Sequence, residues 1–393
     1  MTASRFEDKR IACKHKRFKM KITTSLFLGC TLLTLLNCKG ISNEKNEIEH
    51  PKNVILLISD GTGLSHISAA FYFKDSAVNY SRFQNIGLIK TASSRQAITD
   101  SGAGATAFSC GLKTFNGAIG VADDATPVEN IVEIASSKNI QTGIVATSSI
   151  THATPASFYA HSKSRGNTEE IASQLPHSTI DFFAGGGLQF FNQNKGNRNL
   201  WSAFTKNQFE IDTIALTDFE HIKAHKKQGY LLAKDAMPKF SEGRGNFLSK
   251  ATALAIQFLS KEASGFFLMS EGSQIDWAGH ENNGEYLVSE LIDFDQTIGK
   301  VLDYAEKDGE TLVIVTSDHE TGGFALAAEK RLRKDGTEYS DYRDIEMVFS
   351  TKGHSATLIP VFAYGPGSQE FIGIYENTEI FHKILKVTEW GNR

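Results

Sequence analysis

Short apolar runs recur along the chain, and each is followed by polar residues. The run at residues 53–59 reads Asn-Val-Ile-Leu-Leu-Ile-Ser, which is short and rich in branched aliphatic side chains. Such a run is typical of a strand that is buried on both faces of a sheet. We expect further strands at residues 142–146, 180–184, 266–270, 311–316 and 360–363.

Amphipathic stretches lie between these runs, the clearest at residues 285–306. Strands that alternate with helices predict an α/β fold, with a mostly parallel central sheet and helices on both faces. Two regions break the pattern. Residues 192–247 are polar and irregular, and we interpret them as surface insertions on one side of the core. Residues 329–346 are charged and predict a surface excursion of modest size.

The N-terminal segment has the pattern of a leader, assigned to residues 1–37 with Met20 as the expected start. Lys21 precedes an apolar run at residues 22–36, which is shorter than the roughly 20 residues of a membrane span. This arrangement is typical of a secretory signal. Residues 35–38, Leu-Leu-Asn-Cys, resemble a bacterial lipobox. We therefore expect a mature chain that begins at lipid-modified Cys38, with a plain cleaved signal peptide as the alternative.

Residues 38–52 are polar and charged, which predicts a flexible tether. The remaining residues, 53–393, form the expected catalytic domain and are numerous enough to bury a large core. A leader of this kind predicts export across the inner membrane. The mature protein is then expected in the periplasm or, as a lipoprotein, anchored to the outer membrane.

The net charge argues against a general nucleic-acid binder, and the positions of the cysteines argue against an intrachain disulfide in the globular part. The formal net charge is −4 at pH 7, whereas general nucleic-acid binders normally carry a basic stripe. We therefore expect no nucleic acid specificity. Cys13, Cys30 and Cys38 fall in or beside the leader, so Cys110 has no partner for an intrachain disulfide in the globular part. Cys110 is expected to be a small buried side chain.

Acidic residues and histidines follow several of the predicted strands. Asp60 follows the first strand, Glu271 the fourth and Asp318 the fifth. Open parallel sheets place their sites at the carboxyl ends of the strands, and buried carboxylates are costly unless they are paired with cations. Asp276 and His280 are one helical turn apart, so both can face one ion. Mixed Asp and His ligands suit zinc, while an all-oxygen set suits magnesium.

The stretch at residues 99–107 reads Thr-Asp-Ser-Gly-Ala-Gly-Ala-Thr-Ala and predicts the start of a helix. A serine at a helix N-terminus lies near unpaired N–H groups and the positive end of the helix dipole. That position suits a phosphate bound to or attacked by Ser101. The simpler interpretation is a serine that caps the helix, which is common. The carboxylates and histidines elsewhere in the chain favour the interpretation with phosphate.

Five motifs in this chain, in this order, resemble those of the alkaline phosphatases. Chance would rarely produce five ordered motifs, and the resemblance extends over residues 53–367, nearly the whole expected mature chain. The motifs occupy residues 58–61, 99–107, 271–280, 316–323 and 353–356.

The resemblance implies a role for each residue that stands at a matching position. Ser101 would be the nucleophile and form a phosphoserine, and Arg165 would hold the phosphate oxygens with its planar fork. Two zinc ions and one magnesium ion per subunit are implied. One zinc would be held by Asp276, His280 and His354, the second by Asp60, Asp318 and His319, and the magnesium by Asp60, Thr154 and Glu271.

Two positions depart from the pattern of other members. His152 stands where some members have Asp, and Trp277 stands where some have Lys, a pair that resembles marine and cold-adapted bacterial members. His152 has no carboxylate to offer the magnesium site, so we expect it to hydrogen-bond a metal-bound water or the substrate phosphate. For Trp277, packing beside the site and contact with substrate remain equal alternatives.

The reaction implied by the resemblance is hydrolysis of phosphate monoesters. Related phosphodiesterases usually have a threonine nucleophile and lack the clamping arginine, so Ser101 and Arg165 favour monoesters. A non-catalytic, lipid-anchored phosphate or metal binder is the alternative from another class, but it would not need Ser101. Family members are commonly homodimers, so the resemblance also allows a homodimer.

Overall fold

The computed structural model describes residues 50–192, 200–223 and 226–391. Residues Ile48–Arg393 form one compact unit. The predicted leader, the lipobox cysteine Cys38 and most of the predicted tether lie outside the described residues. Among the described helices, none is both long enough and apolar enough to cross a membrane.

The central element is a mixed sheet, which has ten strands within the described residues. Its strand pairs are parallel except those of β13, which runs antiparallel to both of its neighbours. This confirms the mostly parallel sheet. In spatial order the strands are β14 (Gly373–Glu376), β2 (Asn85–Lys90), β13 (Ile359–Tyr364), β8 (Thr311–Thr316), β1 (Asn53–Ser59), β7 (Phe266–Gly272), β3 (Gln141–Ser149), β4 (Phe182–Gly186), β6 (Lys227–Leu231) and β5 (Phe209–Asp212).

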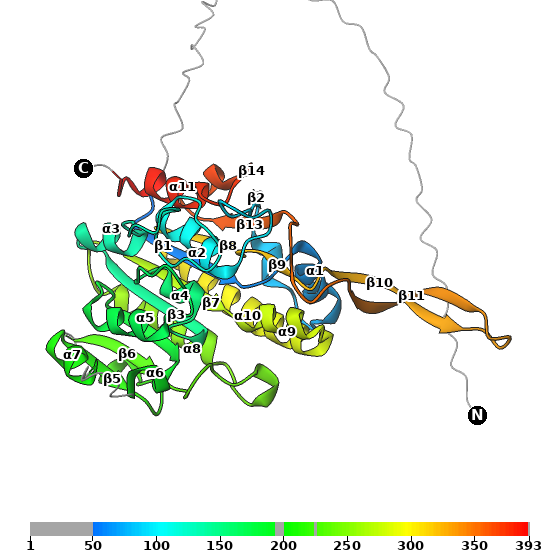
Figure 1. Ribbon diagram of the computed structural model, residues 1–393, viewed down its shortest axis with the longest axis horizontal. Coiled ribbons are helices and arrows are strands. Elements are labelled where there is room, and N and C mark those ends of the chain that lie inside the picture. The colour runs from blue at the N-terminus through cyan, green and yellow to red at the C-terminus, as the bar shows by residue number, and fades with distance from the viewer. Residues whose placement is uncertain (1–49, 193–199, 224–225, 392–393) are drawn as a thin grey trace, which may run out of the picture. The chain divides into compact units, whose positions relative to one another are not determined.

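Helices cover both faces of this sheet, as predicted (Figure 1). Successive residues of a strand point to opposite faces of the sheet. In β1, Leu56 belongs to one hydrophobic cluster and Leu57 to another, and both are fully buried, so each face of the sheet needs a cover. The first cluster packs β1 against α2 (Ser101–Cys110), α3 (Ile131–Ser137), α5 (Thr168–Gln174) and α11 (Glu379–Thr388). The second packs it against α1 (Leu64–Phe73), α8 (Phe247–Leu259) and α10 (Gly284–Asp308).

Short helices complete the described chain. Two of them, α4 (Ala153–Ala156) and α9 (Gln274–Glu281), follow strands β3 and β7 and begin at the sheet edge where those strands end. The others are α6 (Leu188–Asn192), α7 (Leu200–Lys206) and the 3₁₀ helices η1 (Asn79–Arg82), η2 (Leu175–His177), η4 (Phe219–His221), η5 (Phe240–Glu242) and η6 (Ser368–Phe371).

The interpretation of residues 192–247 as surface insertions was wrong for two segments. Strands β5 and β6 lie in this region and extend the central sheet beyond β4. Strand β6 reads Lys-Gln-Gly-Tyr-Leu, so only its last two residues are apolar. Its middle residues are nevertheless buried, because β6 pairs with strands on both sides. The apolar pattern was too sparse to mark it as a strand.

Residues 329–346 belong to a two-stranded hairpin, the β10–β11 arm, made of β10 (Phe324–Leu332) and β11 (Glu338–Phe349). The arm reaches away from the sheet (Figure 1). At its base, the short strands β9 (Glu320–Thr321) and β12 (His354–Ser355) pair with each other. The arm therefore leaves the fold between two segments that carry predicted metal ligands.

Candidate metal centre and nucleophile

Four adjacent parallel strands end at one edge of the sheet and bring the predicted ligands together. Ile58 of β1 is in register with Glu271 of β7 on one side and with Thr316 of β8 on the other. Asp60 and Asp318 follow two residues after Ile58 and Thr316, so their carboxylates lie level with each other and two residues beyond Glu271. Ala146 of β3 is in register with Glu271 as well, and β3 leads to His152 and Thr154.

The residues of the second predicted zinc position lie close together and are fully buried. Asp60, Asp318 and His319 each place a ligand atom within 4.8 Å of the others. The Nε2 atom of His319 is 3.3 Å from Oδ2 of Asp318 and 3.6 Å from Oδ1 of Asp60.

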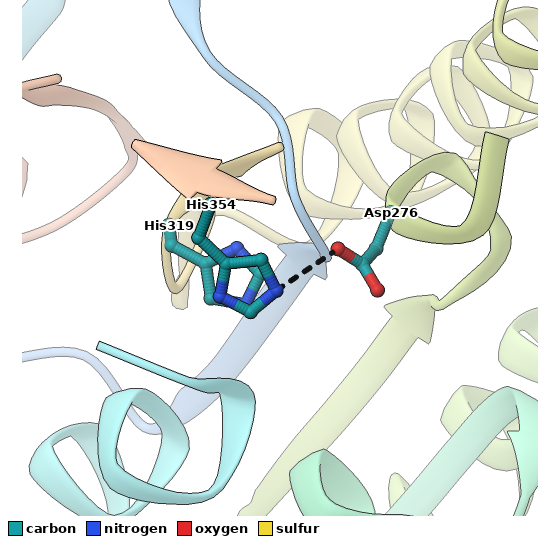
Figure 2. Close-up of side chains that lie close together, drawn as sticks. All are labelled: Asp276, His319 and His354. Atoms are coloured by element: carbon teal, nitrogen blue, oxygen red, sulfur yellow. Dashed lines mark ion pairs between the residues drawn. The ribbon is translucent and has the colours of Figure 1, made fainter. Parts of the chain in front are cut away.

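The residues of the first predicted zinc position also meet. Nε2 of His280 is 3.4 Å from Oδ1 of Asp276, and Nε2 of His354 is 3.7 Å from the same atom. His319 lies directly beside this group, because its ring stacks on that of His354 with centroids 3.6 Å apart. Figure 2 shows Asp276 facing the imidazoles of His319 and His354 across a small gap. The two predicted zinc positions are therefore neighbours.

Backbone carbonyl groups orient two of the imidazoles. Nδ1 of His354 is 2.8 Å from the carbonyl oxygen of Thr99, and Nδ1 of His280 is 2.5 Å from that of Lys352. A carbonyl only accepts, so each Nδ1 carries a proton and each Nε2 of the neutral ring keeps a lone pair toward Asp276. Fixing the tautomer through the other ring nitrogen is the usual arrangement of metal-binding histidines.

The predicted magnesium ligands gather on the other side of Asp60. Ligand atoms of Asp60, Glu271 and His152 lie within 4.8 Å of one another. Thr154, in α4, is fully buried and lies beside Glu271. Glu271 is supported from behind by Ser148, whose hydroxyl donates to its Oε2 at 3.4 Å.

Several buried ligand atoms in this region have no hydrogen-bond partner among the described residues. They are both carboxylate oxygens of Asp60, Oε1 of Glu271, Oδ2 of Asp318, Oγ1 of Thr154 and Nδ1 of His152. Unpaired buried polar atoms are costly, and buried acids are costlier still. Unpaired carboxylate and hydroxyl oxygens gathered at one place fit divalent cations.

The electrostatics of the cluster indicate the same need for positive charge. Burial raises the pKa of Asp60 well above its usual range, and the neighbouring carboxylates of Asp318, Asp276 and Glu271 raise it further. Burial is also the main reason that the pKa of Glu271 rises to about 8. A divalent cation between these groups would favour their ionised forms.

Ser101 lies against this cluster at the start of α2. Its Oγ atom is 3.3 Å from Nε2 of His319. Asp100 caps the helix by accepting the backbone N–H of Ala103 at 3.0 Å. Gly104 allows the helix to approach, because a Cβ atom at that position would lie 2.9 Å from Cβ of Asp318. The small residues of the motif therefore place Ser101 at the edge where the strands end.

Arg165 is held at two points, by Asp100 and by His152. Its Nη1 donates to Oδ2 of Asp100 at 3.0 Å, and its Nη2 lies 3.1 Å from Nε2 of His152. Burial opposes the charge of Asp100, but hydrogen bonds from Ala103, Gly117 and Arg165 lower its pKa. Burial, and then the charge of Arg165, lowers the pKa of His152 to about 4. A neutral His152 that accepts from Arg165 at Nε2 carries its proton on Nδ1.

Trp277 packs edge-to-face against His152, with ring centroids 5.9 Å apart. It is half-buried against the second hydrophobic cluster. The structure thus places every predicted site residue at one end of the sheet.

Comparison with known proteins gives the family of the chain. The family model described as alkaline phosphatase matches residues 51–341, most of the chain. The chain belongs to the alkaline phosphatase family. It is therefore an enzyme of the kind that hydrolyses phosphate monoesters.

Individual relatives agree with this assignment. Alkaline phosphatase 3 of Bacillus subtilis is 33% identical over 88% of this chain and 91% of its own. The alkaline phosphatase of the Antarctic bacterium TAB5 is 65% identical, with a TM-score of 0.85, over 88% of this chain and 99% of that one. A histidine-to-aspartate mutant of the TAB5 enzyme, solved with magnesium bound in the M3 site, is 66% identical with a TM-score of 0.86 over the same shares.

Two residues of the site were missed by the sequence analysis. Asp100 anchors Arg165, and its position directly before Ser101 was the available signal. Thr321 contacts Asp276 and His319. Its position after the Asp-His pair gave no indication of this contact.

Proposed function

We propose that this chain hydrolyses phosphate monoesters through a phosphoserine at Ser101, releasing inorganic phosphate and an alcohol. The observation that carries the proposal is the position of Ser101. Its hydroxyl lies at the N-terminus of α2, 3.3 Å from Nε2 of His319 and beside buried carboxylates that lack partners among the described residues. Family membership supports the overall reaction, and the position of Ser101 supports the covalent route.

We further propose two zinc ions and one magnesium ion per subunit. Asp276, His280 and His354 would hold one zinc, Asp60, Asp318 and His319 the second, and Asp60, Thr154 and Glu271 the magnesium. The unpaired atoms of Asp60, Asp318, Thr154 and Glu271 support metal binding at the second zinc position and at the magnesium position. The close approach of His280 and His354 to Asp276 supports the first zinc position. Magnesium in the M3 site of the TAB5 mutant supports the third ion. Such ions would favour the deprotonated serine and neutralise charge on the phosphate oxygens.

The protein's own groups would attack the phosphorus and bind the phosphate oxygens. The Ser101 oxygen attacks phosphorus, the bond from phosphorus to the alcohol oxygen breaks, and water later cleaves the Ser101–phosphorus bond to restore the hydroxyl. The first N–H groups of α2 have no partners within the helix and suit phosphate oxygens. Arg165, held by Asp100 and His152, supplies a second cationic contact with its guanidinium.

The arginine favours monoesters over diesters. A monoester has one more unsubstituted oxygen than a diester, and the fork of Arg165 can bind two oxygens at once. A diesterase would have to place a second organic group near this cation. A non-catalytic phosphate or metal binder would have no use for the contact between Ser101 and His319.

Substitution of the nucleophile tests the proposal. Ser101→Ala should lower turnover of p-nitrophenyl phosphate by at least about 10³-fold, because the covalent route is lost. Ser109→Ala, in the same helix, is the matched control, since the Ser109 hydroxyl reaches only a backbone oxygen and Cys110. Acid-quenched wild-type enzyme should carry one phosphate on Ser101.

Two results would contradict the proposal. Full turnover by Ser101→Ala would show that another group attacks phosphorus. Faster cleavage of bis-p-nitrophenyl phosphate than of the monoester by the wild type would identify a diesterase.

We also propose that two copies associate through the β10–β11 arm. A two-stranded hairpin is only marginally stable alone in water. Leu332 and Tyr342 on the arm are 72% and 89% exposed, so within one chain their burial does not stabilise it. Helix α1 packs beside β10 and exposes Phe71 and Tyr72. A second copy covering these side chains would stabilise the arm. Light scattering should give twice the chain mass, whereas a monomer at micromolar concentration would contradict this proposal.

For the N-terminal segment we propose a lipid anchor at Cys38, which would place the enzyme in the periplasm or on the outer membrane. The lipobox-like residues 35–38 support this. The intact mass of protein from the membrane fraction should equal a chain from Cys38 plus its lipids. An unmodified N-terminus at another residue would contradict it.

A further inference from the structure

Thr321 lies between the two predicted zinc positions. It is fully buried in the short strand β9. Its hydroxyl donates to Oδ1 of Asp276 at 2.5 Å and lies 3.2 Å from Nδ1 of His319. Asp276 belongs to the first predicted position and His319 to the second. One hydroxyl therefore contacts a ligand of each.

The chemistry of the three groups fixes where the protons are. An ionised carboxylate only accepts hydrogen bonds, so the single hydroxyl proton of Thr321 points to Asp276. The hydroxyl oxygen can then only accept from His319, which requires a proton on Nδ1. In the neutral ring this leaves the lone pair on Nε2, the atom that faces Asp60, Asp318 and Ser101.

We propose that Thr321 is a positioning residue that sets the tautomer of His319 and the orientation of the Asp276 carboxylate, and so couples the two zinc positions. The inference rests on the proposed function for its effect on metal binding. The tautomer itself is a property of the protein without metal.

His319 differs in this respect from the other two imidazoles. Nδ1 of His354 and Nδ1 of His280 each meet a backbone carbonyl, which no substitution of a single side chain removes. The tautomer of His319 depends on a side chain that another ligand shares. A change at Thr321 should therefore disturb both zinc positions together.

The backbone around Thr321 holds its hydroxyl in place. Its N–H donates to the carbonyl of Gly61 at 2.9 Å, and its own carbonyl accepts from Nε2 of His66 at 3.1 Å. Gly61 has a φ of +73°, and a Cβ atom there would lie 2.9 Å from Oγ1 of Thr321 and 2.6 Å from Cα of Asp276. The close approach of these segments leaves Thr321 little freedom to turn away.

Two substitutions test the role of the hydroxyl. Thr321→Val keeps the shape but removes the hydroxyl, and Thr321→Ser keeps it. Thr297→Val is the control, because the buried hydroxyl of Thr297 donates to a backbone carbonyl within α10. Nitrogen-15 spectra of histidine-labelled, metal-free protein report the tautomer of His319. Competition with a chelator reports zinc affinity.

We expect Nδ1–H on His319 in the wild type, Thr321→Ser and Thr297→Val, and loss of that uniform tautomer in Thr321→Val. Zinc affinity should fall roughly 10- to 100-fold in Thr321→Val, the usual cost of removing a group that orients a metal ligand. Thr321→Ser should stay within a few-fold of the wild type.

Two outcomes would overturn the inference about Thr321, and a third would contradict only the proposed function. A proton on Nε2 of His319 in the wild type overturns the inference even if Thr321→Val does not fold. Unchanged tautomer and zinc affinity in a folded Thr321→Val overturn it as well. Absence of zinc binding by the wild type would instead contradict the proposed function, while the tautomer result would still stand.

Discussion

At the scale of single residues, the site gathers buried acids that need positive charge near them. Asp60, Asp318 and Glu271 are fully buried acids at the ends of neighbouring strands. The free-energy cost of burying these carboxylates is tolerable only where cations offset it. Arg165 differs, because its partner Asp100 satisfies it within the protein and keeps its fork oriented. The residue chemistry therefore separates a candidate metal cluster from a proposed, preoriented phosphate contact.

Arg165 gives the prediction at this scale. Arg165→Ala should lower kcat/KM for p-nitrophenyl phosphate by about 10²-fold, since one preoriented donor group for the phosphate oxygens is lost. Arg165→Lys keeps the charge but not the fork, so it should recover only part of this loss. Steady-state kinetics with both variants measure the effect. An Arg165→Ala enzyme with wild-type kcat/KM would exclude a role in binding phosphate.

At the scale of elements, the parallel strands and two helices bring the parts of the site together. Strands β1, β7 and β8 set the height of the carboxylates through their register. Helix α2 brings Ser101 to them, and α1 is linked to β9 through His66. His66 is fully buried, accepts from the N–H of Gly63 at Nδ1 and lies 3.1 Å from the carbonyl of Thr321 at Nε2. Both bonds require the neutral ring with its proton on Nε2.

His66 predicts a dependence of stability on pH. Burial lowers its pKa from 6.5 to about 4. Below pH 6.5 the unfolded chain therefore binds a proton that the folded chain does not, so the free energy of unfolding falls as the pH falls from 6.5 to 4. The loss from this group would reach roughly 3 kcal/mol.

His66→Gln is the matched variant, because its amide can still donate to Thr321 but does not titrate. Urea unfolding of metal-free protein at pH 7, 5.5 and 4 measures the difference between the two chains. The advantage of the wild type over the variant should shrink as the pH falls. A constant difference would show that His66 does not titrate as its burial requires.

The elements also show how much of the fold the sequence predicts. The fifth predicted strand, residues 311–316, coincides with β8, and the predicted helix at 285–306 lies within α10. These segments carry continuous or periodic apolar residues, which burial makes necessary. Strands β5 and β6 were missed because few of their residues are apolar, and their place in the sheet comes from pairing with neighbours. Backbone hydrogen bonding to a neighbouring strand does not require a pattern of apolar side chains, so the sequence of such a short strand does not mark it.

At the scale of the whole molecule, the described chain is one α/β unit whose ligands come from segments far apart in sequence. Predicting that Asp60, Ser101 and Asp318 meet was feasible, because each follows or precedes an element with a clear pattern. The contact of Thr321 with both proposed zinc positions was not predictable, because it depends on the approach of Gly61 and on the pairing of β9 with β12. Such details follow from the packed structure alone.

The central claim is that this end of the sheet holds divalent cations which the reaction requires. Elemental analysis of the purified enzyme, with turnover of p-nitrophenyl phosphate before chelation, after chelation and after return of metal, tests it most directly. The account predicts two zinc ions and one magnesium ion per chain, loss of turnover on chelation and recovery when zinc and magnesium are restored. A chain that purifies without these metals and keeps its turnover through chelation would contradict it.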